Sequence, residues 1–152
     1  MIDRYFEEHE DNSREELKRA EHLVLISLKY NRTCAVMKNG LIRLITSYES
    51  AIWEYLEFLR AAKKLDEVPG AMKDKVEMIK DLLGGAVTKY IRAYNKLVKL
   101  NKAQYCGLNE FRKGLMMRTL DKKPIELDIK GLEEQLRYAQ EFVGLIEVKT
   151  RE

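Results

Sequence analysis

The stretch LIRLITSYESAIWEYLEFLRAA, residues 41–62, is the segment around which we expect the rest of the chain to pack. Its apolar residues recur in alternating steps of four and three, which is the spacing of one face of an α-helix. These residues are Leu41, Ile45, Tyr48, Ile52, Tyr55, Leu59 and Ala62. Further apolar residues flank this seam: Ile42 and Trp53 on one side, and Leu44, Ala51 and Phe58 on the other. Only a narrow strip is polar, consisting of Arg43, Ser47, Ser50, Glu54 and Glu57. A helix that is apolar over most of its circumference is covered on more than one side, so this one is predicted to be central.

Four more helices are expected around this one. Ser13 and Glu16 have the spacing of a capping box, which predicts a helix over 13–30. Thr33 is a suitable N-cap for the central helix, predicted over 35–64. Pro69-Gly70 breaks the chain, Gly84-Gly85 ends the following helix, and the remaining helices are predicted from about residue 86 and from about residue 131.

The period changes between the last two helices. Ile125, Leu127 and Ile129 alternate with acidic residues, which is the two-residue period of a strand. A turn at 121–124 separates this segment from residues 110–120, so we expect a β-hairpin at about 110–129. The chain is therefore predicted to be mainly α: an up-and-down helical bundle of about five helices with one β-hairpin between the fourth and the fifth. An acidic leader, 1–12, precedes a single domain over 13–152.

Composition limits the classes of protein to which the chain can belong. The 152 residues are 45% hydrophobic and 35% charged, as in a globular protein with exposed charged helix faces. No apolar run approaches the roughly 20 residues that span a bilayer, and the acidic N-terminus lacks a signal core, so no membrane association is expected. The two cysteines form no CxxC pair, which favours a reduced chain in the cytoplasm.

The sequence contains no recognisable catalytic or metal-binding motif. Phosphate-binding glycine loops, HExxH and GxSxG are absent, and no Glu-x-x-His pair offers a metal site inside a bundle. We therefore expect no cofactor, no metal and no catalytic residues; the alternative is an enzyme with a small site near His22.

Positive charge is concentrated in residues 86–123, which carry ten Lys and Arg against two acidic residues, while the rest of the chain is net acidic. Cations at helical spacing form one basic stripe that continues onto the hairpin: Lys89, Arg92, Lys96, Lys99, Lys102, Arg112, Lys113 and Arg118. Tyr90, Tyr105 and Phe111 are aromatic residues close to these charges in the sequence. Clustered cations beside aromatic rings are typical of RNA or other polyanion binding. The alternative is a merely solvated helix face, with Arg118 paired across the hairpin to Glu126 or Asp128.

Two further sets of residues are candidates for a site. Glu21, His22, Tyr30 and Arg32 are polar or half-polar groups near the end of the first helix, and Glu21 and Arg32 would share a line if that helix continued to Arg32. A small enzymatic site there competes with the interpretation of His22 as a surface histidine. Ile42 and Trp53 flank the central seam and are covered either by the same chain or by a partner, which makes a homodimer or a protein-interaction module the second hypothesis for function.

The arrangement resembles the HEPN group of small helical bundles. The resemblance lies in the paired helices AEHLVLISLKYNRT and LIRLITSYESAIWEYLEFL and in the basic segment YIRAYNKLVKLNKAQY followed by NEFRKGLMMRT, within residues 13–118. It implies a dimer and a role in RNA binding or processing. HEPN ribonucleases carry an Arg followed, after four to six intervening residues that begin with a polar one, by His, whereas Arg112 is followed by Lys113-Gly114-Leu115-Met116-Met117-Arg118 and no histidine occurs after His22. The resemblance therefore implies a non-nuclease member, with Arg112 as the one motif position present.

Overall fold

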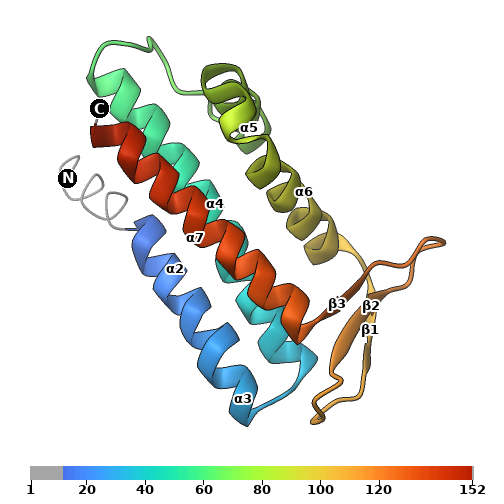
Figure 1. Cartoon of the computed structure of the whole chain (residues 1–152). Helices are drawn as coiled ribbons and strands as arrows, with labels where there is room; N and C mark the ends of the chain where they lie inside the picture. The colour runs from blue at the N-terminus through green and yellow to red at the C-terminus, as the bar shows by residue number, and fades with distance from the viewer. Residues whose placement is uncertain (1–11, 152) are drawn as a thin grey trace.

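The computed structural model describes residues 12–151, which form five helices and a small antiparallel sheet (Figure 1). The first helix consists of α2 (Asn12–His22), the π-helical turn η1 (Leu23–Ser27) and α3 (Leu28–Tyr30). It is followed by α4 (Cys34–Ala61), α5 (Met72–Leu83), the short 3₁₀ turn η2 (Gly84–Ala86) and α6 (Thr88–Lys102). The strands β1 (Tyr105–Leu108), β2 (Met116–Thr119) and β3 (Glu126–Asp128) precede the final helix α7 (Ile129–Arg151). The predicted mainly helical bundle is confirmed. The predicted leader lies outside the described residues, except for Asn12, which begins α2.

The central position of α4 is confirmed, since it packs against α2, α5, α6 and α7. Thr33 caps it as predicted, because its Oγ1 accepts a hydrogen bond from the backbone N–H of Val36. A cluster of rings joins α4 to its neighbours: Tyr48 lies 5.2 Å from Phe142 of α7 and 5.7 Å from Tyr94 of α6, measured between ring centroids. These aromatic contacts join both α6 and α7 to α4.

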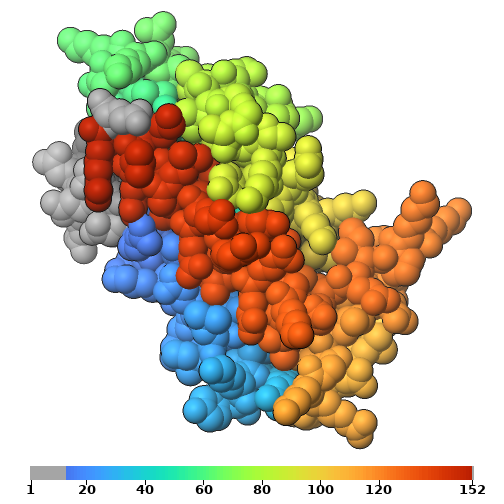
Figure 2. Space-filling view, in the orientation of Figure 1, coloured from blue at the N-terminus to red at the C-terminus, as the bar shows by residue number. Residues whose placement is uncertain are grey.

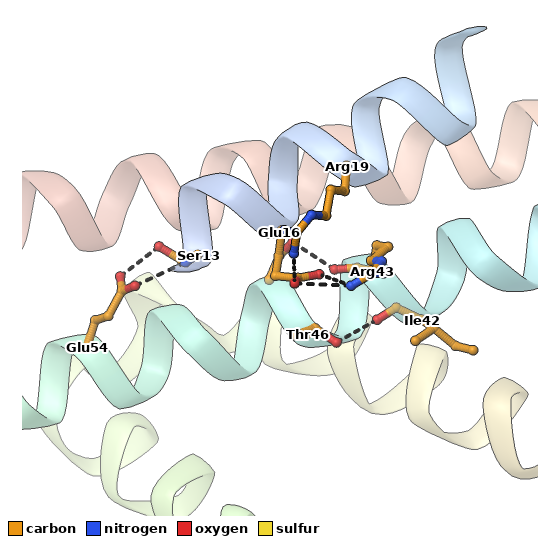
Figure 3. A network of polar contacts seen from close by, with 8 residues as sticks. Ser13, Glu16, Arg19, Ile42, Arg43, Thr46 and Glu54 are labelled. Atoms are coloured by element: carbon orange, nitrogen blue, oxygen red, sulfur yellow. Dashed lines mark hydrogen bonds and ion pairs between the residues drawn. The ribbon is translucent and has the colours of Figure 1, made fainter. Parts of the chain in front are cut away.

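Two members of the polar strip of α4, Arg43 and Glu54, bind side chains of α2 (Figure 3). Ser13 donates hydrogen bonds from its backbone N–H and its hydroxyl to the carboxylate of Glu54, at 3.0 and 2.7 Å. Glu16 is 4% exposed and accepts hydrogen bonds from Arg19, at 2.6 Å, and from Arg43 of α4, at 3.0 and 3.1 Å. The predicted capping box of Ser13 and Glu16 is therefore wrong: both side chains bind across the helix interface, because α4 offers them charged partners.

The π-helical turn at Leu23–Ser27 packs beside Gly40 of α4. Gly40 is buried there, and a Cβ at this position would come within 3.2 Å of Val24 Cγ2. A glycine in mid-helix costs stability, but here it leaves room for the side chain of Val24. Ile26, which the helical period predicts near the core, is instead 48% exposed, since the wider turn changes the phase of the residues within it.

The sheet is larger than the predicted hairpin. The hairpin itself is confirmed as β2 and β3, with Met117 opposite Leu127 and Arg118 opposite Glu126. A third strand, β1, pairs antiparallel with the other edge of β2, so the order is β1-β2-β3. Residues 110–115, predicted as part of a strand, form the loop between β1 and β2. Met117 and Leu127 are buried against the bundle, and Met116 is half-buried on the opposite face.

The sheet lies at one end of the bundle, and the turn between β2 and β3 projects from the body beside the end of α6 (Figures 1 and 2). Lys122 and Lys123 are exposed in this turn. The predicted stop at Gly84 is also confirmed, because this residue has a φ of 56° at the end of α5. No helix among residues 12–151 is long and apolar enough to cross a membrane.

Candidate nucleic-acid interface

The basic stripe is carried mainly by α6, whose amphipathic pattern fixes which residues face outward. Ile91, Tyr94 and Leu97 are buried against the bundle, whereas Arg92, Lys96, Lys99 and Lys102 are exposed. Tyr94 anchors the helix by donating a hydrogen bond from Oη to Glu49 of α4 at 2.6 Å. Burial and this carboxylate raise the pKa of Tyr94 well above its ordinary value, so its hydroxyl stays protonated as the donor.

Lys89 is at the start of the stripe but differs from the other cations of α6. Its Nζ lies 3.9 Å from the carboxylate of Glu141 in α7, and 5.6 and 5.0 Å from the ring centroids of Tyr90 and Tyr138. Tyr90 is also engaged, since its ring packs 5.8 Å from Phe142 and its hydroxyl contacts Glu141. Burial and then Glu141 raise the pKa of Tyr90. Lys89 and Tyr90 therefore join α6 to α7, and the charge of Lys89 is partly offset by Glu141.

The other four cations of α6 have no such partner. Among the described residues, no carboxylate forms an ion pair with Arg92, Lys96, Lys99 or Lys102, and their side chains make no hydrogen bond. We call these four residues the α6 basic face. Because each is exposed and uncompensated, the face has an excess of positive charge at the surface.

The sheet contributes less charge than the sequence suggests. Arg118 is paired with Glu126 across the hairpin at 3.0 Å, which is the neutralisation that the sequence left open as an alternative. Arg112 and Lys113 are exposed in the loop between β1 and β2, and their side chains form no ion pair or hydrogen bond within residues 12–151. Tyr105 is half-buried, with Lys38 Nζ 5.5 Å from its ring centroid. Of the three aromatic residues that the sequence places near the stripe, Phe111 alone is exposed, with 74% of its surface accessible, whereas Tyr90 and Tyr105 are half-buried.

The loop between β1 and β2 is docked on the N-terminus of α4. Both carboxylate oxygens of Glu110 accept from the backbone N–H of Cys34, at 3.2 Å, and the backbone N–H of Phe111 donates to the carbonyl of Arg32 at 2.6 Å. A carboxylate at a helix N-terminus is favourable because the first amides have no partner in the helix and the helix dipole is positive there. This contact positions the loop on the body of the protein.

Cys34 lies under this loop and is 3% exposed. Burial, followed by the hydrogen bond and the charge of Glu110, raises the pKa of its thiol from an ordinary value of 9.0 to about 12. The group is therefore a neutral thiol at physiological pH and unsuited to nucleophilic chemistry.

The candidate small site near the first helix is not assembled. Helix α3 ends at Tyr30, so Arg32 lies beyond it and does not share a helical line with Glu21. Glu21 accepts a hydrogen bond from Gln140 of α7 at 3.3 Å, whereas His22 is exposed on the side near Arg43. Within residues 12–151, no group of three or more His, Cys, Asp or Glu is placed to hold a metal ion.

The two candidate interface residues lie on one side of α4 but line different grooves. Ile42 is 40% exposed at the edge of a groove between α4, α5 and α6. Trp53 is half-buried and faces Phe58 and Val143 in a groove formed by the ends of α2, α4 and α7.

Sequence reasoning did not place residues 30–32 beside residues 110–113. The contact depends on strand β1, which returns the chain to the N-terminus of α4. Its residues YCGL lack the alternation that revealed β3. Comparisons with protein-family models, with curated proteins and with solved structures find no match for this chain.

Proposed function

We propose that this protein is a non-catalytic, cytoplasmic RNA-binding protein that holds RNA phosphates on the α6 basic face. The observation that carries this proposal is that, within residues 12–151, no carboxylate pairs with Arg92, Lys96, Lys99 or Lys102, in contrast to the paired Lys89 and Arg118. Clustered, uncompensated cations bind polyanions by releasing condensed counterions. Membership of the HEPN group stays a prediction. The proposal of RNA binding does not depend on it, because it rests on the charge of α6.

The test is the affinity for a labelled 20-nucleotide RNA at several salt concentrations. If four cations contact a single strand, the logarithm of the association constant should fall with the logarithm of salt concentration with a slope of about −3. This corresponds to a loss of about 50-fold between 50 and 200 mM salt. The double variant Lys96→Glu/Lys99→Glu should bind at least tenfold more weakly and with a shallower slope.

The matched control is Lys18→Glu/Lys64→Glu, which produces the same change in net charge at two exposed lysines on α2 and after α4. This control should lower the affinity for the RNA by less than about threefold. Equal losses in both double variants would mean that net charge and not the α6 basic face governs binding. Absent or salt-independent binding would also refute the proposal.

Self-association is the second candidate function, and the exposure of Ile42 favours it. This residue adjoins Ile45, Met72 and Val76 in the groove between α4, α5 and α6, so a second chain could cover an apolar surface there. Light scattering should then show a dimer that Ile42→Glu converts to a monomer. A wild-type protein that is monomeric at all concentrations would contradict this function.

A further inference from the structure

Tyr30 and Phe111 are the two most exposed large hydrophobic side chains in the described part of the chain, at 87% and 74%. They are distant in sequence, but the hydrogen bond from the backbone N–H of Phe111 to the carbonyl of Arg32 places their segments side by side. Figure 1 shows the end of α3 and the loop between β1 and β2 at the same end of the molecule. Two aromatic rings are therefore presented to solvent at one end of the bundle.

The loop that carries Phe111 has a defined conformation. Asn109 and Phe111 have φ values of 57° and 67°, which are uncommon for residues other than glycine. Three hydrogen bonds close the loop on itself: Asn109 Nδ2 to the carbonyl of Gly114, the Arg112 N–H to the carbonyl of Asn109, and the Leu115 N–H to the carbonyl of Arg112. Together with the hydrogen bonds of Glu110 to α4, these bonds hold the loop in one conformation with Phe111 exposed. The loop therefore loses little conformational entropy when a ligand binds.

The surroundings of the two rings are cationic. Arg32, Arg112 and Lys113 have no carboxylate partner among residues 12–151. The carboxylate in this loop, Glu110, is engaged by the backbone of Cys34. A ligand for this surface must therefore combine flat apolar faces with negative charge.

Unpaired nucleotides have both properties. We propose that Tyr30 and Phe111 form a platform on which bases of single-stranded RNA stack, while Arg32, Arg112 and Lys113 hold the adjoining phosphates. The platform rests on the proposed function, because it specifies which type of RNA a protein that binds RNA on the α6 basic face would take. Bases in a duplex are already stacked and paired, so they cannot cover exposed rings in this way.

The variant Tyr30→Ala/Phe111→Ala tests the platform, with a 10-nucleotide oligo(U) and a 10-base-pair RNA duplex as probes. The double variant should bind the single strand at least tenfold more weakly, since stacking of a base on an aromatic side chain contributes substantially to affinity. Its affinity for the duplex should change by less than twofold. Circular dichroism should be unchanged, because both side chains lie outside the core.

Two further variants separate stacking from general loss of exposed apolar surface. Leu82→Ala/Leu120→Ala removes apolar side chains that are 44% and 61% exposed, on α5 and after β2, and it should leave both affinities unchanged. Phe111→Trp keeps a stacking face, so it should retain single-strand affinity and report binding by quenching of its fluorescence, with the wild-type signal of Trp53 subtracted.

The outcomes distinguish the platform from the α6 basic face. If Lys96→Glu/Lys99→Glu weakens binding but the aromatic double variant does not, the platform is overturned and the proposed function stands. If the aromatic variant alone weakens binding, the platform stands and the α6 basic face is overturned. Three other results each overturn the platform. They are an equal loss of affinity for the single strand and the duplex in the aromatic variant, the absence of any RNA binding, and a dimer that the aromatic substitutions convert to a monomer.

Discussion

Cys34 and Cys106 are the two thiols of the chain, and the fold places them in opposite environments. Cys106 is exposed on strand β1, whereas Cys34 is buried and its pKa is raised to about 12. At pH 8 a thiol reagent should therefore modify one thiol per native chain, at Cys106, and a second one in denaturant. Mass spectrometry of the labelled peptides checks the assignment, with Cys106→Ala as the control that abolishes native labelling. Rapid native labelling of Cys34 would contradict the covered position of this residue.

Individual residues also show what sequence patterns can establish. Thr33 and Gly84 were predictable as helix boundaries because their roles depend on the neighbouring few residues. Ser13 and Glu16 match a capping box equally well, yet their partners are Glu54 and Arg43 on another helix. Local spacing does not contain the information that a stronger distant partner will be present.

At the scale of elements, the interface between α2 and α4 depends on a buried carboxylate. Glu16→Ala should lower the free energy of unfolding by about 1–3 kcal/mol, because it removes the shared acceptor of Arg19 and Arg43 at a buried position. The cost is limited since both arginines are partly exposed and can be hydrated. Urea denaturation measures it, and Glu15→Ala, one residue away on the exposed side, should change stability by less than about 0.5 kcal/mol. Equal effects of the two substitutions would show that the interface network is not stabilising.

The helices were predictable to within a few residues because their apolar period extends over many turns. The hairpin of β2 and β3 was predictable from the alternation of Ile125, Leu127 and Ile129. Strand β1 was not, since it is a short edge strand whose residues obtain their conformation from pairing with β2. The π-helical turn was also not predictable, because the residues Leu23–Ser27 have an ordinary helical pattern in the sequence.

At the scale of the whole molecule, several acidic groups are buried in their neutral forms. The pKa of Cys34 is raised from 9.0 to about 12, and burial raises those of Tyr48 and Tyr94 above their ordinary value of 10.0. The unfolded chain releases these protons at lower pH than the folded chain does. Stability from these groups is therefore complete below about pH 9 and decreases as the pH rises further.

Urea midpoints measured from pH 7 to pH 11 test this expectation. The midpoint of the wild type should fall above about pH 9, and Cys34→Ala should show a shallower fall, whatever its stability at pH 7. Cys106→Ala should follow the wild-type profile. Identical slopes in all three proteins would exclude a contribution from the buried thiol.

The candidate site was predictable in part. The α6 basic face follows from helical spacing, so its four exposed cations could be identified before the fold was known. The pairing of Lys89 with Glu141 could not, because it depends on how α7 lies against α6. The placement of Phe111 beside the segment that follows Tyr30 was likewise hidden, since it arises when the sheet docks on the N-terminus of α4.

The docking of Glu110 on Cys34 has a consequence for the order in which the protein folds. The two residues are 76 positions apart, and contacts of such long range form only after most of the intervening chain is in place. The first amide of α4 is therefore hydrated until a loop that is synthesised after α5 and α6 docks on it. The sheet depends on α4 for this docking, so it is not expected to be an independent folding unit.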